Sequence, residues 1–446
     1  MSKQIYLPLK DEEMRAQAAK CMDCRIPYCH GAGCPVLDLI PDFNDLICRR
    51  RWRDALALFY TKNPFPEITG HICPALCEAA CVHSIDDAAV PIRQIELSLT
   101  EKGFAEGWVV PESPKTKTGK KVAIVGSGPA GLTCATYLNK LGHKIVVFEK
   151  EKMPGGILYY GIPDFKLEKR YVRRRIDILR EEGIVFETEV AIGIDIGLQY
   201  LMKYFDAIVL AAGALVPRDL SIPGRELSGI HFAMEYLTQQ NRLNNHEPVR
   251  EEERINANGK KVVVVGGGDT GVDCVESANR QDALEIYQIE LMPFETSHST
   301  QPGPQDPTIL RASELQAKNC VRKWNILTKK FIGENGRVTG IEAVEIEWVQ
   351  DTAGRIGFSE KANSTFVIPC ELALIAVGFV SPGNDELLQN SSVVLNQLGF
   401  IEVDENNMTG QEGVFCAGDM ANGSSLVIKA IDSGLQTAKS VAKFLN

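Results

Sequence analysis

One stretch of the chain, residues 121–149, limits the possible folds more than any other. An apolar run typical of a buried parallel strand leads into the glycine pattern Gly126-x-Gly128-x-x-Gly131. Apolar residues at helical spacing follow, and then a second apolar run ends at Glu149. Strand, glycine turn, helix and a strand ending in an acid are the fingerprint of a dinucleotide-binding βαβ unit. The sequence therefore predicts a parallel α/β sheet that binds a dinucleotide, in preference to a tight turn without function.

Each residue type in this first fingerprint has a separate expected role. Gly126 permits the tight turn, Gly128 lets a pyrophosphate approach the backbone, and Gly131 lets the helix pack on the strand. The helix N-terminus supplies amide donors for phosphate, and Glu149 is placed to accept hydrogen bonds from ribose hydroxyls. The cofactor-binding residues expected here are Gly126, Gly128, Pro129, Ala130, Gly131 and Glu149.

A second unit of the same kind begins at Gly266-Gly-Gly-Asp-Thr-Gly271, and the strand after it leads to Glu290. Two such units predict two dinucleotides, and the residues expected to contact the second are Gly266, Gly268, Asp269, Thr270, Gly271 and Glu290. Glu290 would bond the free 2′-hydroxyl of NADH and repel the 2′-phosphate of NADPH. Alternatively, Glu290 faces solvent and positive charge comes from Arg311, Lys318 or Arg322.

Further glycine-bearing segments are expected beside the first cofactor. The loop 153–163 supplies Gly156 and Ile157, and Gly213 follows the strand 207–210. This loop has no cysteine pair, so we do not expect disulfide reduction there. Late in the chain, residues 372–378 are interpreted as a strand that returns to the first sheet.

Another late strand ends in Gly418-Asp419. Asp419 is expected to accept from a ribitol hydroxyl, and the helix that starts after Ser424 would direct its positive end at the reduced ring. The alternative is that Asp419 is an ordinary N-cap or turn residue.

Seven of the thirteen cysteines fall in two groups, Cys21-x2-Cys24-x4-Cys29-x4-Cys34 and Cys73-x3-Cys77-x3-Cys81. Such groups are typical of iron–sulfur clusters, which take four thiolates each. Zinc sites usually repeat Cys-x2-Cys, so zinc is the weaker alternative. Seven thiolates are one short of two clusters. The eighth ligand is either Cys48 or a carboxylate such as Glu96, and a single cluster with spare cysteines is the remaining alternative.

The charge and hydropathy of the chain exclude some classes of protein. A formal net charge of −10 argues against a nucleic-acid-binding protein that depends on phosphate contacts. The basic runs 49–53 and 173–175 are expected to be solvated helix faces. No apolar run approaches the roughly 18 residues of a membrane span, and no signal peptide is visible. We therefore expect a cytoplasmic protein that binds neither nucleic acid nor membrane.

The order of these features resembles the small (β) subunit family of glutamate synthase and, more distantly, the N-terminal half of dihydropyrimidine dehydrogenase. The segments 154–165 and 267–271 carry the resemblance most specifically. It implies FAD on the first fingerprint, NADH or NADPH on the second, and two [4Fe-4S] clusters near the N-terminus. One implied ligand set is Cys21, Cys24, Cys29 and Cys81, and the other is Cys34, Cys73, Cys77 and Glu96.

The resemblance also implies an α/β fold with two Rossmann-like dinucleotide-binding domains, one inserted in the other, and a mainly α-helical N-terminal iron–sulfur domain. The expected domains are 1–118 for the clusters, 119–225 with 373–446 for FAD, and 226–372 for NAD(P)H. The chain departs from the family at Lys429, where an aromatic residue is expected, and at 301–307, which lacks tryptophan.

The implied function is electron input to an FMN-containing large subunit of glutamate synthase, because the cofactors carry the chemistry and no catalytic acid–base pair is needed. No site for glutamine hydrolysis is expected, since Ser2 follows Met1. Two alternatives remain: a similar reductase subunit that serves ferredoxin or a bifurcating complex, and a non-enzymatic zinc module whose glycine loops only turn.

Overall fold

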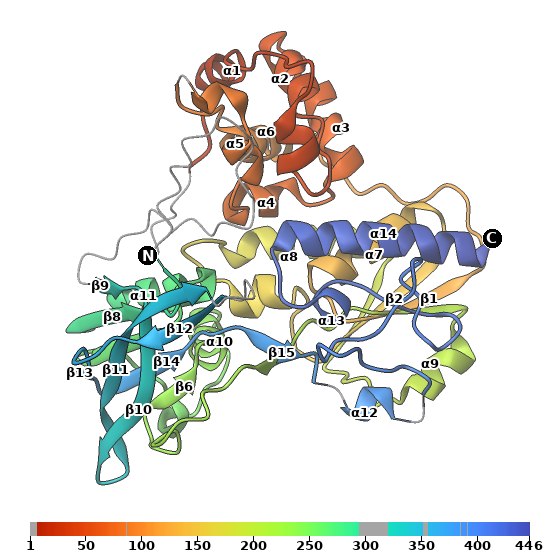
Figure 1. Cartoon of the computed structure of the whole chain (residues 1–446). Coiled ribbons are helices and arrows are strands. Elements are labelled where there is room, and N and C mark those ends of the chain that lie inside the picture. The colour runs from red at the N-terminus through yellow and green to blue at the C-terminus, as the bar shows by residue number, and fades with distance from the viewer. Residues whose placement is uncertain (1–6, 86, 294–319, 351–355, 384, 390) are drawn as a thin grey trace.

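The computed structural model describes residues 7–85, 87–293, 320–350, 356–383, 385–389 and 391–446. Figure 1 shows a helical N-terminal region above two α/β regions that lie side by side. The chain passes from the helical region into the first α/β region, crosses to the second, and returns to the first before it ends.

The N-terminal region is a cluster of short helices. They are α1 Asp11–Ala18, α2 Ile40–Cys48, α3 Trp52–Lys62, α4 Pro66–Ile72, α5 Leu76–Ala79 and α6 Ile92–Ala105, with a π-helical turn Cys29–Gly33 and a 3-10 turn Val82–Ile85. The buried residues Ile40, Phe43 and Ile47 follow helical spacing along α2. The Phe43 and Phe59 rings meet edge-on with centroids 4.5 Å apart. These contacts give the region its own core.

The first α/β region is built on a parallel sheet of order β16-β4-β1-β2-β3. Its strands are β1 Lys121–Val125, β2 Lys144–Glu149, β3 Val185–Thr188, β4 Ala207–Leu210 and β16 Val414–Cys416, and its helices are α7 Pro129–Lys140, α8 Lys169–Glu181, α9 Leu198–Tyr204, α13 Asp419–Asn422 and α14 Val427–Leu445. Helices α7 and α14 pack closely because Gly434 lacks a side chain; a Cβ there would lie 2.5 Å from the Ala130 carbonyl oxygen. The strand–helix–strand order predicted around the first fingerprint is confirmed.

The second α/β region repeats this arrangement, with sheet order β6-β14-β7-β8-β9. Its strands are β6 Ile230–Phe232, β7 Lys261–Val265, β8 Glu285–Ile289, β9 Cys320–Lys323 and β14 Leu372–Ile375, and its helices are α10 Ala233–Asn244 and α11 Asp269–Arg280. Strand β14 pairs in parallel with β6 and β7. The prediction that residues 372–378 return to the first sheet was therefore wrong. An apolar strand buried on both faces carries no mark of which sheet it joins.

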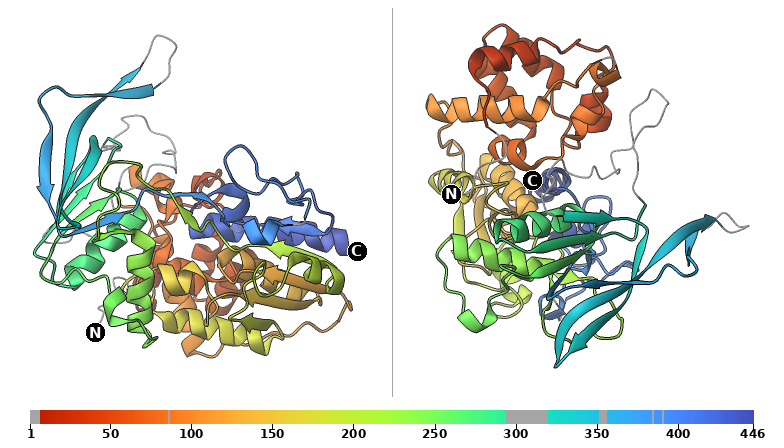
Figure 2. Two further views of the ribbon diagram at one scale, coloured as in Figure 1. Left: turned by 90° about the horizontal axis from the view of Figure 1, so that it is seen from below. Right: turned by 90° about the vertical axis from the view of Figure 1, so that its left-hand side faces the viewer.

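An antiparallel sheet, not anticipated from the sequence, covers the second region and projects from it (Figure 2). It contains β10 Ile326–Glu334, β11 Arg337–Gln350, β12 Ile356–Glu360 and β13 Phe366–Pro369. A short pair, β5 Val216–Pro217 and β15 Phe379–Ser381, joins the outgoing and returning connections between the α/β regions. Helix α12, Asp385–Leu388, lies in the returning segment.

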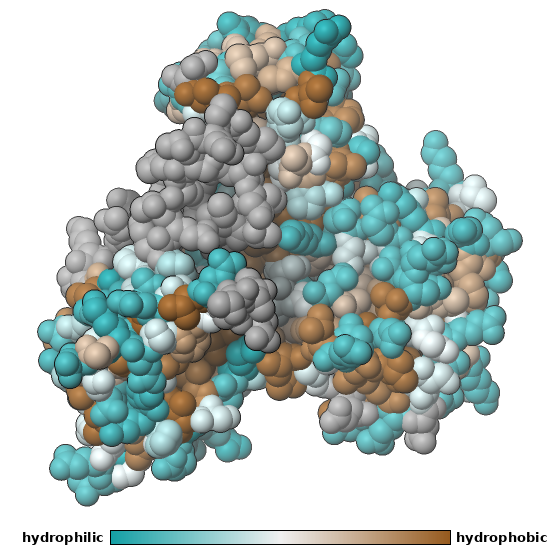
Figure 3. Space-filling model, viewed as in Figure 1, coloured by the Kyte–Doolittle hydropathy of each residue, from teal (hydrophilic) through white to brown (hydrophobic). Residues whose placement is uncertain are grey.

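The surface seen in Figure 3 and the character of the helices are consistent with the absence of a long apolar run in the sequence. The face seen in Figure 3 mixes hydrophilic and apolar residues. Across the residues that the structure describes, no helix combines the length and apolar character needed to cross a membrane.

Candidate cofactor sites

The glycines of the first fingerprint have the backbone roles expected of them. Gly126 has φ of +102°, and a Cβ there would lie 2.5 Å from the Ala211 carbonyl oxygen. A Cβ at Gly131 would lie 2.0 Å from the Gly126 carbonyl oxygen. Gly128 differs, because a Cβ there would meet no atom within 4 Å. The helix N-terminus is therefore open on the side of Gly128, where a pyrophosphate needs to approach.

Glu149 closes the other side of this turn. Its carboxylate is 5% exposed, accepts from the Ser127 amide at 3.1 Å and also accepts from the Ser127 hydroxyl. The Ser127 hydroxyl oxygen in turn accepts from the Gly155 amide at 2.8 Å. Ser127 was not singled out from the sequence, although it lies inside the glycine pattern.

Two distant segments reach the same turn. A Cβ at Gly156 would lie 2.9 Å from the Gly128 Cα, and a Cβ at Gly418 would lie 2.8 Å from the Ala130 Cβ. Ile157, half exposed, begins the π-helical turn Ile157–Gly161. The structure thus gathers residues of the first fingerprint, the loop 153–163 and the late Gly-Asp strand around one turn. The open cradle fits a dinucleotide, while the individual contacts stay predictions.

Asp419 begins α13, and the Ser425 hydroxyl donates to it at 3.3 Å. Burial raises the pKa of Asp419 to about 6. The start of a helix is compatible with both interpretations of Asp419, so its contact with a ribitol hydroxyl stays a prediction. Gly213 has φ of +85°, and the space beside it is open.

The glycines of the second fingerprint have the same kinds of close contact as those of the first. A Cβ at Gly266 would lie 2.2 Å from the Ala376 carbonyl oxygen, and one at Gly271 would lie 2.2 Å from the Gly266 carbonyl oxygen, while Gly268 again has no neighbour. Glu290 accepts from the Gly267 amide and, at 2.9 Å, from the Met292 amide. Its carboxylate therefore lies at the turn rather than pointing into solvent. Asp269 and Thr270 are the first two residues of α11.

An ion pair connects the two nucleotide-binding regions. Lys166 Nζ lies 2.5 Å from Asp273 Oδ1 in α11, and the Arg280 guanidinium lies 4.5 Å from the Phe165 ring centroid. Burial raises the pKa of Asp273 to about 6. The loop after the first fingerprint thus contacts the helix of the second.

The cysteines surround two separate cavities in the N-terminal region. Cys21, Cys24, Cys29 and Cys81 line one cavity, and Cys34, Cys73, Cys77 and Glu96 line the other. Burial raises the pKa of Cys29 and of Cys34 to about 12, so these thiols stay protonated unless a cation is bound. In the described part of the chain, no three His, Cys, Asp or Glu side chains converge closely enough to hold a single metal ion. The donor sets fit groups that span a cavity, and their ligand roles stay predictions.

The second cavity also contains a carboxyl group that sequence reasoning missed. Asp38 lines it together with Glu96. Burial raises the pKa of Asp38 to about 7 and that of Glu96 well above its usual value. Glu96 Oε1 accepts from the Asn63 amide at 2.8 Å. Cys48 ends α2 and lines neither cavity.

The basic run 173–175 is not the solvated helix face that we expected. Arg175 Nε donates to Glu67 Oε1 at 2.6 Å, with side chains 7% and 0% exposed. Arg174 pairs with Glu101 and stacks 3.4 Å from the Phe104 ring centroid. The burial of Arg175 and the partial burial of Arg174 depend on acidic partners in the N-terminal region, whereas Arg173 is exposed as expected. The arginines of the run 49–53, in contrast, have exposed side chains as predicted, although residues 49–51 lie between α2 and α3 rather than on a helix face.

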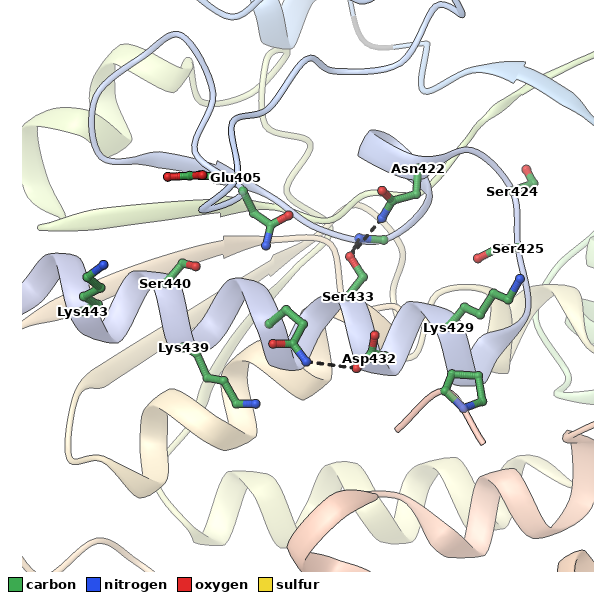
Figure 4. Close-up of a pocket in the computed structure, with 14 residues that line it drawn as sticks. Glu405, Asn422, Ser424, Ser425, Lys429, Asp432, Ser433, Lys439, Ser440 and Lys443 are labelled. Carbon is green, nitrogen blue, oxygen red and sulfur yellow. Dashed lines mark hydrogen bonds between the residues drawn. The ribbon is translucent and has the colours of Figure 1, made fainter. Parts of the chain in front are cut away.

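Lys429, which departs from the family, lies in a polar groove of about 950 Å³ between α14 and the segment containing Glu405 and Asn407 (Figure 4). Pro35 from the N-terminal region lines the same groove. The other departure, 301–307, lies outside the described residues, as do Arg311 and Lys318. Arg322 lies in β9.

Sequence families agree with this division of the chain. Residues 120–434 match the pyridine nucleotide-disulphide oxidoreductase family, and residues 1–108 match the family described as dihydropyrimidine dehydrogenase domain II, 4Fe-4S cluster. The first indicates FAD and NAD(P)H as cofactors, and the second indicates 4Fe-4S clusters.

Solved structures support the fold. The chain is similar to FprA from Mycobacterium tuberculosis in complex with NADPH, with a TM-score of 0.60 and 18% identity over 74% of this chain and 85% of that chain. It is also similar to T. acidophilum thioredoxin reductase, with a TM-score of 0.51 and 19% identity over 73% of this chain and 98% of that chain.

Relatives by sequence match nearly the whole chain. The glutamate synthase [NADPH] small chain of Mycobacterium tuberculosis is 43% identical over 99% of this chain and 91% of its own length. That of Bacillus subtilis is 41% identical over 99% and 93%. The glutamate synthase [NADH] of Schizosaccharomyces pombe is 40% identical over 98% of this chain and 21% of its own length. The chain belongs to the glutamate synthase small-chain family, within the pyridine nucleotide-disulphide oxidoreductases.

Proposed function

We propose that this protein is the electron-input subunit of a glutamate synthase. It oxidises NAD(P)H and passes the electrons to a large subunit that makes glutamate from glutamine and 2-oxoglutarate. Bound FAD would supply hydride acceptance with release of single electrons, and bound clusters would supply one-electron relay. The finer parts of this proposal are a large subunit that contains FMN and a cytoplasmic location.

Different residues of the chain would hold FAD, the nicotinamide cofactor and the two clusters, and would keep them apart. The open turns at Gly128 and Gly268 would each receive a pyrophosphate, with Glu149 and Glu290 beside the ribose. We also propose the two cavity-lining sets as cluster ligands, with residues 119–225 and the segment after β14 holding FAD. The boundary lies after β14 because that strand belongs to the second sheet.

The proposed electron route rests on the position of the two cavities between α14 and the surface. Ile428, in the first turn of α14, lines the second cavity. Ile40 and Ile92 line both cavities, so the two are neighbours. Met22 and Tyr28 line the first cavity and are 56% and 40% exposed. A path therefore runs from the FAD-binding region through the second cavity to the first, and from there to the surface where a partner would take the electrons.

Cofactor content and partner capture test this proposal. The anaerobically purified protein should contain about one FAD and, for two clusters, about eight iron atoms per chain. It should co-purify with the large chain, and the complex should form glutamate with NAD(P)H. Iron near four atoms, stoichiometric zinc, or glutamate formation that does not need this chain would contradict the proposal. Capture of ferredoxin instead would support the alternative reductase.

A pair of variants tests the ligand sets. We expect Glu96→Ala to change the resonance spectrum of one cluster, because it removes the carboxylate from the second cavity. Cys48→Ala should change neither cluster, since Cys48 lines neither cavity. A spectrum altered only by Cys48→Ala would reverse the assignment of the eighth ligand.

A further inference from the structure

A buried ion pair joins the N-terminal region to the first α/β region. Arg175 in α8 donates from Nε to Glu67 Oε1 at 2.6 Å and from Nη2 to the Tyr60 hydroxyl at 3.0 Å. The Arg175 and Glu67 side chains are 7% and 0% exposed. Figure 1 shows α4, which carries Glu67, as the lowest helix of the N-terminal region, directly above α8. The contact therefore lies inside the interface between the two regions.

Helix α4 leads from this contact to the second cavity. Glu67 is in its first turn, and Cys73, at its end, donates its amide to the Thr69 carbonyl at 2.8 Å. The side chain of Asn63 donates to the Thr69 hydroxyl at 2.7 Å and to Glu96 Oε1 at 2.8 Å. Fewer than two turns of α4 therefore connect the partner of Arg175 to Cys73 and, through Asn63, to Glu96, which both line the second cavity.

A second ion pair, between Arg174 and Glu101, joins α8 to α6, but around α4 the rest of the interface is apolar and tightly packed. Phe65 and Ile68 belong to the same core as the first sheet. A Cβ at Gly70 would lie 2.8 Å from the Leu97 Cβ, so α4 is fixed against α6. Apolar burial is not directional, and by itself it would leave α4 free to slide along α8. The two hydrogen bonds of the planar guanidinium are directional, and a lysine cannot reproduce both from one geometry.

We propose that Arg175 is a positioning residue that, through Glu67 and Tyr60, fixes the second cluster relative to the flavin and so governs the electron transfer between them. This inference rests on the proposed function. With both groups bound, the reduced flavin would give up two electrons and one proton in two transfers. Each electron would reduce the second cluster by one unit of charge and move on before the next arrives, and the proton would pass to water. No covalent bond forms between the groups. Arg175 lines neither cavity, so it acts only through Glu67 in α4 and Tyr60 in α3.

The test replaces the ion pair by an apolar pair, because removal of one partner alone would leave a buried unpaired charge and destabilise the fold. The holoprotein with Arg175→Met and Glu67→Leu is compared with Arg180→Met, an exposed arginine of the same helix that pairs within the helix. We measure iron and flavin content, the rate of flavin reduction by NADPH and NADH, the rate of cluster reduction by freeze-quench resonance, and hydrogen exchange of the α4 amides.

The double variant should retain iron and flavin and reduce its flavin at the wild-type rate. Its cluster reduction should slow by roughly tenfold, as expected for a small displacement of reacting groups, and its α4 amides should exchange faster. Arg180→Met should match the wild type in every measurement. Faster exchange with unchanged cluster reduction would overturn the inference, because the pair would then contribute only to stability.

A gentler variant keeps the test decisive if the double variant loses its iron. Tyr60→Phe removes one hydrogen bond and leaves the ion pair in place. Slower cluster reduction in Tyr60→Phe, with flavin reduction unchanged, supports the inference, and an unchanged rate overturns it. A wild-type protein without flavin and cluster signals would instead refute the proposed function.

Discussion

The two fingerprint turns have nearly the same backbone but different surroundings. At the first, Glu149 is 5% exposed, Gly156 lies against Gly128, and Gly418 lies against Ala130. At the second, Glu290 is only half-buried and Asp269 is exposed. Among the residues that the structure describes, segments from three parts of the sequence enclose the first turn, and the second is more open.

This difference matches the different needs of the two ligands. A prosthetic FAD must stay bound through every turnover, whereas NAD(P)H must enter and its oxidised product must leave. If FAD occupies the first turn, as we propose, enclosure by the loop 153–163 and the segment around Gly418 would slow its release, while a more open second turn would permit NAD(P)H to exchange.

The largest expected effect comes from two separate variants that place a larger side chain in each turn, at Gly128 or at Gly268. Gly128→Val should remove FAD and leave the N-terminal clusters assembled, because its side chain occupies the pyrophosphate position without striking the protein. Gly268→Val should retain FAD and raise KM for NAD(P)H by roughly tenfold or more. Flavin content, iron content and KM are the measurements.

Gly131→Val is the matched folding control, since its Cβ would lie 2.0 Å from the Gly126 carbonyl oxygen. It should yield little folded protein. FAD retained by a folded Gly128→Val protein, or lost from Gly268→Val, would break the comparison between the two turns.

A smaller effect should follow from the carboxyl of Asp419 beside the enclosed turn. Burial raises the pKa of Asp419 to about 6 in the protein without FAD. A donating ribitol hydroxyl stabilises the ionised form and lowers this pKa, so FAD affinity should be full above about pH 6 and fall as the pH drops below it. The loss should reach about tenfold, the value of a hydrogen bond to a charged group.

Titration of apoprotein with FAD at several pH values measures this dependence, and Asp419→Asn should abolish it. The KM of the holoenzyme for NAD(P)H should not depend on the ionisation of Asp419. An identical pH dependence in Asp419→Asn would show that Asp419 is an ordinary turn residue.

The fingerprints were predictable because each glycine is tied to one local backbone requirement. Gly126, Gly128 and Gly131 sit where a turn, an open approach and a close packing need them, and all three requirements lie within one short segment. The partners of β14 were not predictable, since its apolar residues suit the centre of either parallel sheet. The projecting sheet of β10 to β13 was also missed, although β10 alternates between buried and more exposed positions over much of its length.

Long-range pairs were beyond the reach of a single sequence. Arg175 is buried because Glu67, 108 positions away, meets it in the interface. Nothing near Arg175 in the chain distinguishes it from Arg180, which is exposed. Asp38 was missed for a similar reason: its place in the second cavity depends on how α2, α4 and α6 pack.

The smallest expected effect concerns the choice between NADH and NADPH at the open turn. Glu290 lies where a 2′-phosphate would meet it, and its carboxylate accepts from the Gly267 and Met292 amides. A like-charge contact that is partly solvated costs about 1 kcal/mol, so kcat/KM should be higher for NADH. Glu290→Gln keeps the size and removes the charge, and it should raise kcat/KM for NADPH by about fivefold. Glu285→Gln, an exposed residue at the start of β8, the strand that Glu290 follows, should change neither value. A preference for NADPH that Glu290→Gln leaves unaltered would place the selection of the cofactor in another segment of the second region.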